Sequence, residues 1–208
     1  MTTIETPRLV LRRWREEDVL PFAAINADPE VMRWIGDGSV HDEERTRGMV
    51  GMLEKHWDEE GFGLFAVELR ETGALAGFTG LAVPRFMPEV LPAVEVGWRL
   101  GRSFWGRGLA TEAARAALRF GFRDRGLDRV ISLVQTGNSP SERVTAKLGM
   151  RLERELISSR SGRPTQVFAL TGAEYAARER HSTTDRWAPT RLRPRTGEPR
   201  PERRLDLT

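Results

Sequence analysis

The chain has no cysteine among its 208 residues. This absence excludes disulfide bonds, thiolate metal sites and a cysteine nucleophile together. Tyrosine is nearly missing as well, since Tyr175 is the single one, and histidine occurs only as His41, His56 and His181. The spacing of the histidines matches neither a metal site nor a catalytic triad, so we expect no bound metal.

Long apolar runs are missing too. No segment approaches the roughly 20 apolar residues that a membrane-spanning helix needs. Residues 1–5 lack the basic stretch and apolar core of a signal peptide. We therefore expect no membrane partner and a cytoplasmic location. A length of 208 residues with 39% hydrophobic and 30% charged residues is typical of one soluble globular domain.

Lysine is scarce, with only Lys55 and Lys147, so arginine carries most of the positive charge. Nine arginines against five acids give the segment after residue 177 a charge of +4. Because the whole chain carries +3, residues 1–177 are left at −1. The end of the chain is also rich in proline and cannot bury a core. We expect a domain over residues 1–177 and a disordered tail over 178–208, with nucleic-acid binding by the tail as a less favoured alternative.

Local patterns predict mixed secondary structure. Residues 8–12 alternate polar and apolar side chains, which is the period of a half-buried strand. Acids or an Asp-Pro pair begin the early helices. Strands and helices in the observed order indicate an α/β fold with a largely antiparallel sheet at its start. We predict strands over residues 8–12, 64–69, 74–82, 94–100, 130–134, 152–157 and 166–170, and helices that begin near Glu16 and Asp28 or span 42–60, 109–124 and 141–148.

The most informative motif is Trp105-Gly106-Arg107-Gly108-Leu109-Ala110-Thr111-Glu112, between a predicted strand and a long helix. Glycines let the backbone approach a ligand, and the helix start offers unpaired N–H groups and the positive end of a dipole. These features suit a pyrophosphate, although a plain strand-to-helix turn has the same pattern. The motif lacks the Gly-Lys-Ser/Thr of a Walker A loop and the third glycine of the Rossmann fingerprint.

Together with segments elsewhere, this loop resembles the GNAT superfamily of acetyltransferases, and within it the branch that acetylates ribosomal-protein alanine. The likeness runs in order over residues 4–170. It rests also on Thr6-Pro7-Arg8-Leu9-Val10-Leu11-Arg12, Asp28-Pro29-Glu30-Val31-Met32, Gly77-Phe78-Thr79-Gly80-Leu81, Glu95-Val96-Gly97-Trp98, Asn138-Ser139-Pro140-Ser141 and Lys147-Leu148-Gly149-Met150.

The resemblance implies a mixed, mostly antiparallel central sheet that is flanked by helices and splayed between the fourth and fifth predicted strands. It also implies an N-acetyltransferase that moves an acetyl group from acetyl-CoA directly to a primary amine. The amine would belong to a peptide N-terminus or to a small molecule. Relatives are often dimers, so a homodimer is an open alternative.

The resemblance further implies which residues hold acetyl-CoA. Backbone groups of two residues of the fourth strand would pair with the pantetheine arm like an added strand. The side-chain amide of Asn138 would fix the pantetheine or the phosphate end. Arg102 and Arg107 are either additional phosphate contacts or solvated surface residues. The strand residues are Trp98 and Leu100, and the pyrophosphate would be held by N–H groups of Gly106, Arg107, Gly108, Leu109, Ala110 and Thr111.

Direct transfer needs a base for the amine and an acid for the departing thiolate. The resemblance points to Glu95 as the base and to Ser141 as the acid, because Thr145 stands where many members carry a tyrosine. The alternatives are a structural carboxylate at Glu95 and a helix cap at Ser141. A protein that binds acyl-CoA without catalysis is therefore a second functional hypothesis. The loop over residues 83–93, with Phe86 and Met87, is expected to border the acceptor site.

Overall fold

The computed structural model describes residues 2–181. Its strands form one sheet of eight, in the order β1-β2-β3-β4-β5-β6-β8-β7. All neighbours are antiparallel except β5 and β6, which run parallel. The mixed, mostly antiparallel sheet expected from the resemblance is therefore confirmed. The strands are β1 (Ile4–Glu5), β2 (Leu9–Arg12), β3 (Leu64–Leu69), β4 (Leu75–Ala82), β5 (Glu95–Leu100), β6 (Arg129–Gln135), β7 (Arg151–Ile157) and β8 (Pro164–Thr171).

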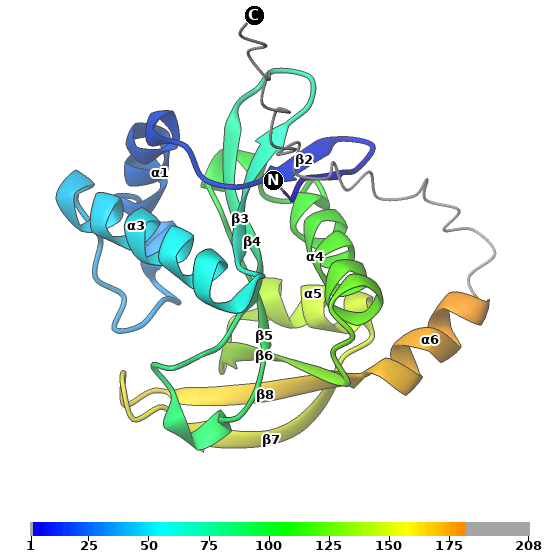
Figure 1. Ribbon diagram of the computed structural model, residues 1–208. Helices are drawn as coiled ribbons and strands as arrows, with labels where there is room; N and C mark the ends of the chain where they lie inside the picture. The colour runs from blue at the N-terminus through cyan, green and yellow to red at the C-terminus, as the bar shows by residue number, and fades with distance from the viewer. Residues whose placement is uncertain (1, 182–208) are drawn as a thin grey trace, which may run out of the picture.

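Helices lie on both faces of the sheet, with α1 and α3 on one side and α4 and α5 on the other (Figure 1). The alanines of the α4 side are fully buried at Ala113, Ala114 and Ala117, so this helix lies close against the strands. The opposite layer is built around Phe22 of α1 and Val50 of α3. The helices are α1 (Val19–Asn26), α2 (Pro29–Met32), α3 (Glu43–Glu60), α4 (Leu109–Arg119), α5 (Ser139–Leu148) and α6 (Gly172–His181), with the short 3₁₀ helices η1 (Glu16–Asp18), η2 (Pro88–Val90) and η3 (Arg102–Phe104) and the π-helical segment η4 (Phe120–Asp124), which continues α4.

Side-chain caps fix the starts of α2 and α3 where the sequence predicts them. Asp28 accepts a hydrogen bond from the Glu30 N–H at 2.9 Å, and Pro29 is the first residue of α2. Asp42 caps α3, which ends at Gly61 in the left-handed conformation (φ 71°). Helix α5 begins at Ser139, two residues before its predicted start, because Asn138 is its cap.

A buried ion-pair network joins the first strands to the α1 layer. Both terminal nitrogens of Arg12 donate to Asp18, at 2.7 and 2.8 Å, and its Nε donates to Glu68 at 2.7 Å. The Arg12 and Asp18 side chains are only 8% and 3% exposed. Both acids raise the pKa of the Arg12 guanidinium, so its charge is permanent. The network fixes η1 and with it the direction of α1.

The chain end departs from prediction. Helix α6 continues to His181, so the predicted boundary after residue 177 falls inside a helix. Two contacts secure α6: Arg178 donates to the Gly149 carbonyl at 2.9 Å, and the Tyr175 ring stacks on Phe122 with centroids 4.7 Å apart. A count of arginine and proline does not reveal such contacts. The remainder of the predicted tail, residues 182–208, lies outside the described residues.

Candidate active site

Strands β5 and β6 separate near the centre of the sheet. They share one paired position, Glu95 with Ile131. There the Ile131 N–H donates to the Val94 carbonyl at 2.9 Å. No further β5–β6 pair exists within the described residues, so the two strands diverge toward their carboxyl ends. This is the splay expected between the fourth and fifth predicted strands.

The register of β4 and β5 shows which backbone groups face this opening. The Gly101 N–H donates to Ala76 O at 2.9 Å, which marks a hydrogen-bonded pair. Because such pairs alternate along an antiparallel ladder, the N–H and C=O of Arg99 and Gly97 also point to β4. Those of Trp98 and Leu100 then point to the opening. The Leu100 carbonyl already accepts the Trp105 indole N–H at 2.7 Å, which leaves its N–H and both groups of Trp98.

The glycine-rich loop lies at the start of α4. Gly106 and Gly108 both adopt left-handed backbone conformations, with φ of 72° and 76°. A Cβ atom would meet nothing within 4 Å at Gly106, and only Arg8 Nη2 at 3.6 Å at Gly108. Within residues 2–181 no side chain caps α4, and its first N–H groups, including those of Leu109, Ala110 and Thr111, have no intrahelical partners. The loop is thus open, and its donors converge at the helix start.

One element of this loop was not predicted from the sequence, namely the pair of Arg8 and Glu112. The two side chains form an ion pair at 2.6 Å, and Arg8 Nη1 donates to the Arg107 carbonyl at 2.8 Å. Thr6 also donates to Glu112, at 2.7 Å. These contacts join the first strands to the loop and to the first turn of α4. Arg8 and Glu112 both belong to segments that carry the family resemblance, and this is the one sequence feature that could have pointed to the pair.

The arginines near the loop differ in their partners. Arg102 pairs with Asp28 Oδ2 at 3.2 Å and so links η3 to the cap of α2. Arg107 is exposed, like the glycines on either side of it. Of the two arginines considered as additional phosphate contacts, only Arg107 therefore has its guanidinium free of an ion pair within the described residues.

Asn138 and Ser141 lie together at the start of α5, directly after β6. Asn138 Oδ1 accepts the Ser141 N–H at 3.3 Å, so the asparagine is the helix cap and Ser141 is not. The Asn138 amide NH₂ remains available for a ligand. Ser141 is half-buried, and no group in residues 2–181 hydrogen-bonds its hydroxyl. The hydroxyl is thus free to act on a bound molecule.

The other hydroxyl candidates are committed elsewhere. Thr145, at the position where many family members have tyrosine, is fully buried and donates to the Glu142 carbonyl at 2.8 Å. Tyr175 lies on α6 and donates to Glu179 at 2.8 Å. Burial and this acid raise the pKa of Tyr175, which makes it a poorer proton donor. Ser141 is therefore the remaining hydroxyl among those considered from the sequence.

Glu95 lies at the point where β5 and β6 part. Its side chain is half-buried, and burial raises its pKa to about 7, against a partial opposing effect of a hydrogen bond from the Leu133 backbone. A carboxyl with a pKa near neutrality can take and return a proton at physiological pH. The next residue on the same face, Gly97, has no side chain, and a Cβ there would meet only Glu95 Oε1, at 3.9 Å. No side chain at position 97 therefore covers the strand beside the Glu95 carboxylate.

The loop over residues 83–93 covers the same face as Glu95. Met87 and Val90 pack against Ile131, the residue paired with Glu95. Met87 is 1% exposed and thus belongs to the core, whereas Phe86 is exposed beneath the guanidinium of Arg160. Of the two residues expected to border an acceptor, only Phe86 has an accessible side chain.

A second loop, between α2 and α3, reaches the end of β6. Arg163 donates to the Arg33 carbonyl at 2.9 Å and to the Asp37 carbonyl at 2.5 Å. Gln135 of β6 donates to the Gly36 carbonyl at 2.8 Å. The Trp34 ring lies 3.5 Å from the position of a Cβ on Gly137, just before the α5 cap. This loop therefore bridges the α1–α3 layer and the carboxyl end of β6.

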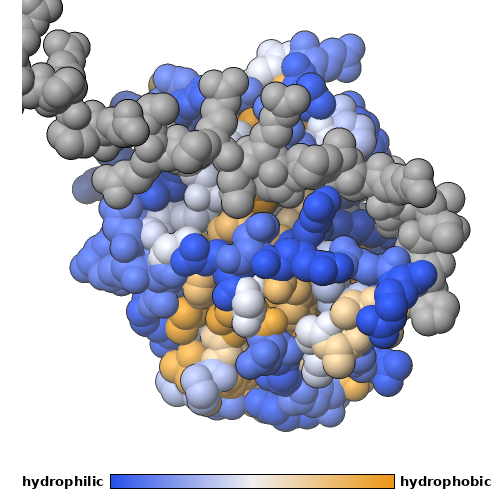
Figure 2. Space-filling model, turned by 45° about the vertical axis from the view of Figure 1, so that its right-hand side comes forward, coloured by the Kyte–Doolittle hydropathy of each residue, from blue (hydrophilic) through white to orange (hydrophobic). Residues whose placement is uncertain are grey.

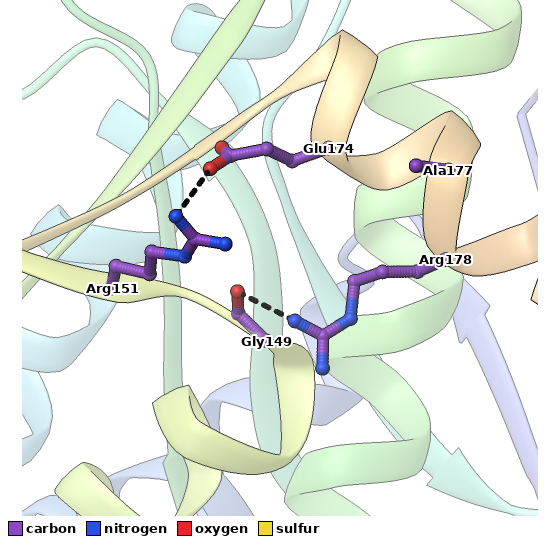
Figure 3. A pocket seen from close by; sticks show the side chains of 5 residues that line it. All are labelled: Gly149, Arg151, Glu174, Ala177 and Arg178. Carbon is purple, nitrogen blue, oxygen red and sulfur yellow. Dashed lines mark hydrogen bonds and ion pairs between the residues drawn. The ribbon is translucent and has the colours of Figure 1, made fainter.

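A small pocket of about 140 Å³ lies elsewhere, at the far end of α5 from Asn138. Arg151 and Glu174 pair across it at 3.6 Å, and Arg178 binds Gly149 (Figure 3). It is separate from the β5–β6 opening.

Figure 2 shows apolar residues gathered in the lower half of one face and bordered by hydrophilic ones. Within residues 2–181 no cluster of acids or histidines could hold a metal, and no helix is long and apolar enough to cross a membrane.

Comparison with known proteins identifies the family. Residues 8–151 match the acetyltransferase (GNAT) domain. The N-acetyltransferase YnaD of Bacillus subtilis (strain 168), itself uncharacterized, is 33% identical over 72% of this chain and 83% of its own length. A GNAT-family acetyltransferase from Bacillus anthracis has a similar structure, with a TM-score of 0.70 and 27% identity over 83% of this chain and all of its own.

A further solved structure is that of Mycobacterium smegmatis RimJ in complex with CoA-disulfide. It matches with a TM-score of 0.66 over 83% of this chain and 90% of its own, at 21% identity, which shows a common fold. The match over residues 8–151 covers the sheet from β2 to the start of β7, both diverging strands and the glycine-rich loop. The chain therefore belongs to the GNAT acetyltransferase family and is an acyltransferase enzyme.

Proposed function

We propose that the enzyme transfers an acetyl group from acetyl-CoA directly to a primary amine. The observation that carries this proposal is the free edge of β5 next to the glycine-rich loop. Trp98 and Leu100 direct backbone groups into the opening, where an extended amide chain can pair with them as an added strand. The start of α4 follows this strand after η3 and the glycine-rich loop, and it offers unpaired N–H groups for an anion.

The chemistry of acetyl-CoA fits these residues. Its pantetheine arm has amides that match a free strand edge, and its pyrophosphate matches N–H groups of residues 106–111. Left-handed glycines at 106 and 108 leave the space that the phosphates need. The Asn138 NH₂ group, which is not used by the cap, would bind the pantetheine or the phosphate end. The CoA-disulfide complex of the RimJ relative supports this choice of donor.

Two side chains would handle the protons. Glu95 would remove a proton from the acceptor ammonium so that the amine can attack the thioester carbonyl. The Trp98 carbonyl and the Leu100 N–H would hold the pantetheine arm, and the Trp98 N–H, which also faces the opening, would stabilise negative charge on the thioester carbonyl oxygen. The N–H of the neighbouring Gly97 points to β4 and is not available to the carbonyl oxygen. Ser141 would give a proton to the departing thiolate, since its hydroxyl is free.

The second functional hypothesis, a protein that binds acyl-CoA without catalysis, is less well supported. Such a protein needs no base, yet Glu95 is partly buried at the opening at an energetic cost and has a pKa near neutrality. That cost is expected where a carboxyl acts in catalysis.

The proposal is tested by thiol release from acetyl-CoA with a panel of N-terminal peptides, polyamines and aminoglycosides as acceptors. We expect amine-dependent thiol release and acetylation of the amine nitrogen, measured by mass spectrometry. Release that does not depend on any amine, together with tight acetyl-CoA binding, would favour the sensor hypothesis. Calorimetry with acetyl-CoA alone separates loss of donor binding from the choice of a wrong acceptor.

A further inference from the structure

A buried arginine lies further along the face of β5 that carries Glu95. Arg99 is 7% exposed, and its guanidinium lies over the Phe78 ring at 5.2 Å from the centroid. Its Nη1 donates to Asn26 Oδ1 at 2.7 Å, and its Nε is buried without a hydrogen-bond partner. Of the five N–H donors of a guanidinium, the described chain thus uses one.

No carboxylate of the described residues neutralises this charge. Within residues 2–181 Arg99 forms no ion pair, and burial lowers its pKa to about 10. By contrast, Arg12, the other buried arginine of this layer, has two acids around it. Isolated buried charges are costly, and proteins normally pair them. An arginine buried with free donors and no acid is therefore suited to an anion from outside the chain.

The residue that hydrogen-bonds Arg99 is polar and uncharged. Asn26 holds the guanidinium and donates in turn to Thr46 Oγ1 at 3.2 Å, and both residues are fully buried. His41 lies nearby: its backbone N–H donates to Asn26 O at 3.0 Å, its Nδ1 is buried without a partner, and burial and Arg45 and Arg99 lower its pKa. These contacts orient Arg99 without satisfying its charge.

The surface between Arg99 and Glu95 is open at its centre. Side chains at positions 95, 97 and 99 lie on one face of the strand, and position 97 is glycine. A Cβ at Gly97 would meet only Glu95 Oε1. The Cα atoms of Glu95 and Arg99 are about 13 Å apart at the rise of a strand. That span suits an extended acceptor of about four residues.

We propose that Arg99 binds an acidic group of the acceptor, so that the substrates are amines that carry a carboxylate up to about 13 Å from the reacting nitrogen. This inference rests on the proposed function, because Glu95 marks where the amine must lie. The amine would lie beside Glu95, the chain of the acceptor over Gly97, and the carboxylate on the free donors of Arg99. Arg99 is a specificity residue and has no part in the chemical step.

Matched acceptor pairs test this assignment. Tetrapeptide amides with Glu or Gln at the third residue, and 6-aminohexanoate with its amide, differ only in the acidic group. We expect kcat/KM for the acidic member to exceed that of the neutral one by at least about tenfold, because hydrogen bonds to charged groups are strong. The peptide and small-molecule pairs also distinguish the two sources of the carboxylate.

Variants assign the preference to Arg99. Arg99→Met should abolish it through a higher KM for acidic acceptors, leave neutral acceptors within about twofold, and leave acetyl-CoA affinity unchanged. Arg99→Lys should retain part of it. The control Lys55→Gln removes one positive charge from an exposed position on α3 and should change nothing. Melting temperatures show whether each variant folds. If Arg99→Met does not fold, the acceptor pairs measured on the wild type and on Arg99→Lys test the assignment instead.

Equal kcat/KM for both members of every pair in the wild type would overturn the inference, as would a preference that survives in Arg99→Met. Calorimetry of the same acceptor pairs on CoA-saturated protein measures acceptor binding separately from acetyl transfer. Tighter binding of the acidic member without any turnover would sink the proposed acetyl transfer and retain the role of Arg99. Turnover without any preference for acidic acceptors would support the proposed acetyl transfer and overturn the role of Arg99.

Discussion

At the scale of single residues, Glu95 has an unusual environment for a carboxyl group. It lies where two strands part, beside a glycine, and burial raises its pKa to about 7. A carboxylate must be ionised to accept a proton from the amine, so the wild-type rate should rise with pH through about 7. Glu95→Gln should reduce kcat/KM about a hundredfold at pH 7 and less at high pH, where free amine is plentiful. A pH–rate profile that is the same for both proteins would contradict the assignment.

The same shift predicts the effect of pH on stability. In the unfolded chain this carboxyl has a pKa near 4.5, and in the folded protein near 7, so the native state binds more protons between these values. Stability contributed at this site is therefore highest below pH 4.5 and lost as the pH rises through 7. Because Gln carries no charge, Glu95→Gln should be more stable than wild type at pH 8, by up to about 3 kcal/mol. Denaturant unfolding at pH 4 and 8 measures this difference, which should vanish at the lower pH.

Ser141 differs from its neighbour Ser139 in exposure and not in residue type. Ser141 is half-buried with a free hydroxyl, whereas Ser139 is exposed one helical position after the Asn138 cap. Ser141→Ala should lower kcat about tenfold or more and leave acetyl-CoA affinity almost intact, because in the proposed function the hydroxyl would act on the leaving group. Ser139→Ala should leave both unchanged. A similar loss in the two variants would indicate a general effect on the start of α5.

At the scale of elements, the loop before α4 depends on backbone conformations that favour glycine. Gly108→Val should abolish acetyl-CoA binding, because a side chain there fills an open loop and opposes a φ of 76°. The control Gly73→Val has nearly the same φ, 70°, in the β3–β4 turn, where a Cβ meets nothing within 4 Å. Both variants therefore carry similar strain, and calorimetry should show loss of binding in Gly108→Val alone. Equal affinities would remove this loop from the cofactor site.

Elements with strong local signals could be predicted from the sequence, and elements defined by tertiary contacts could not. Residues 64–69 form β3 as predicted, because their apolar pattern and the following Glu-Thr-Gly turn are local features. Strand β1, of two residues, exists only through its pairing with β2. Helix α6 depends on contacts of Arg178 and Tyr175 with residues far along the chain. The arginine content of this segment therefore pointed to a tail.

In the candidate site, too, residues in recognisable motifs could be predicted, and residues defined by tertiary contacts could not. The resemblance singled out Glu95, the glycine-rich loop, Asn138 and Ser141, which are now placed around one opening. Their roles stay predictions. The Arg8–Glu112 clamp joins residues 104 positions apart, and no local pattern predicts such a pair. The lack of an acidic partner for Arg99 among residues 2–181 likewise could not be predicted, because the sequence of a strand does not show which acids lie near its arginine.

At the scale of the whole molecule, the β5–β6 opening can be reached from both faces of the sheet. The glycine-rich loop and α5 lie with α4 on one side, while Glu95 faces the loop that contains Met87. A donor bound along β5 can thus meet an acceptor that comes from the opposite face. The proposed direct transfer would then need both substrates together, with their reacting atoms held in contact for attack.

This arrangement predicts the kinetic mechanism. The chain has no cysteine, and the Thr145 hydroxyl is committed within its own helix. Ser141 has no histidine or acid bonded to its hydroxyl within the described residues, so nothing there activates it as a nucleophile. The acetyl group should therefore pass from thioester to amine without a covalent acyl-enzyme. Initial rates measured at several concentrations of both substrates should give intersecting double-reciprocal lines. Parallel lines, or an isolated acetylated enzyme that transfers its group to the amine, would instead require a nucleophile on the protein.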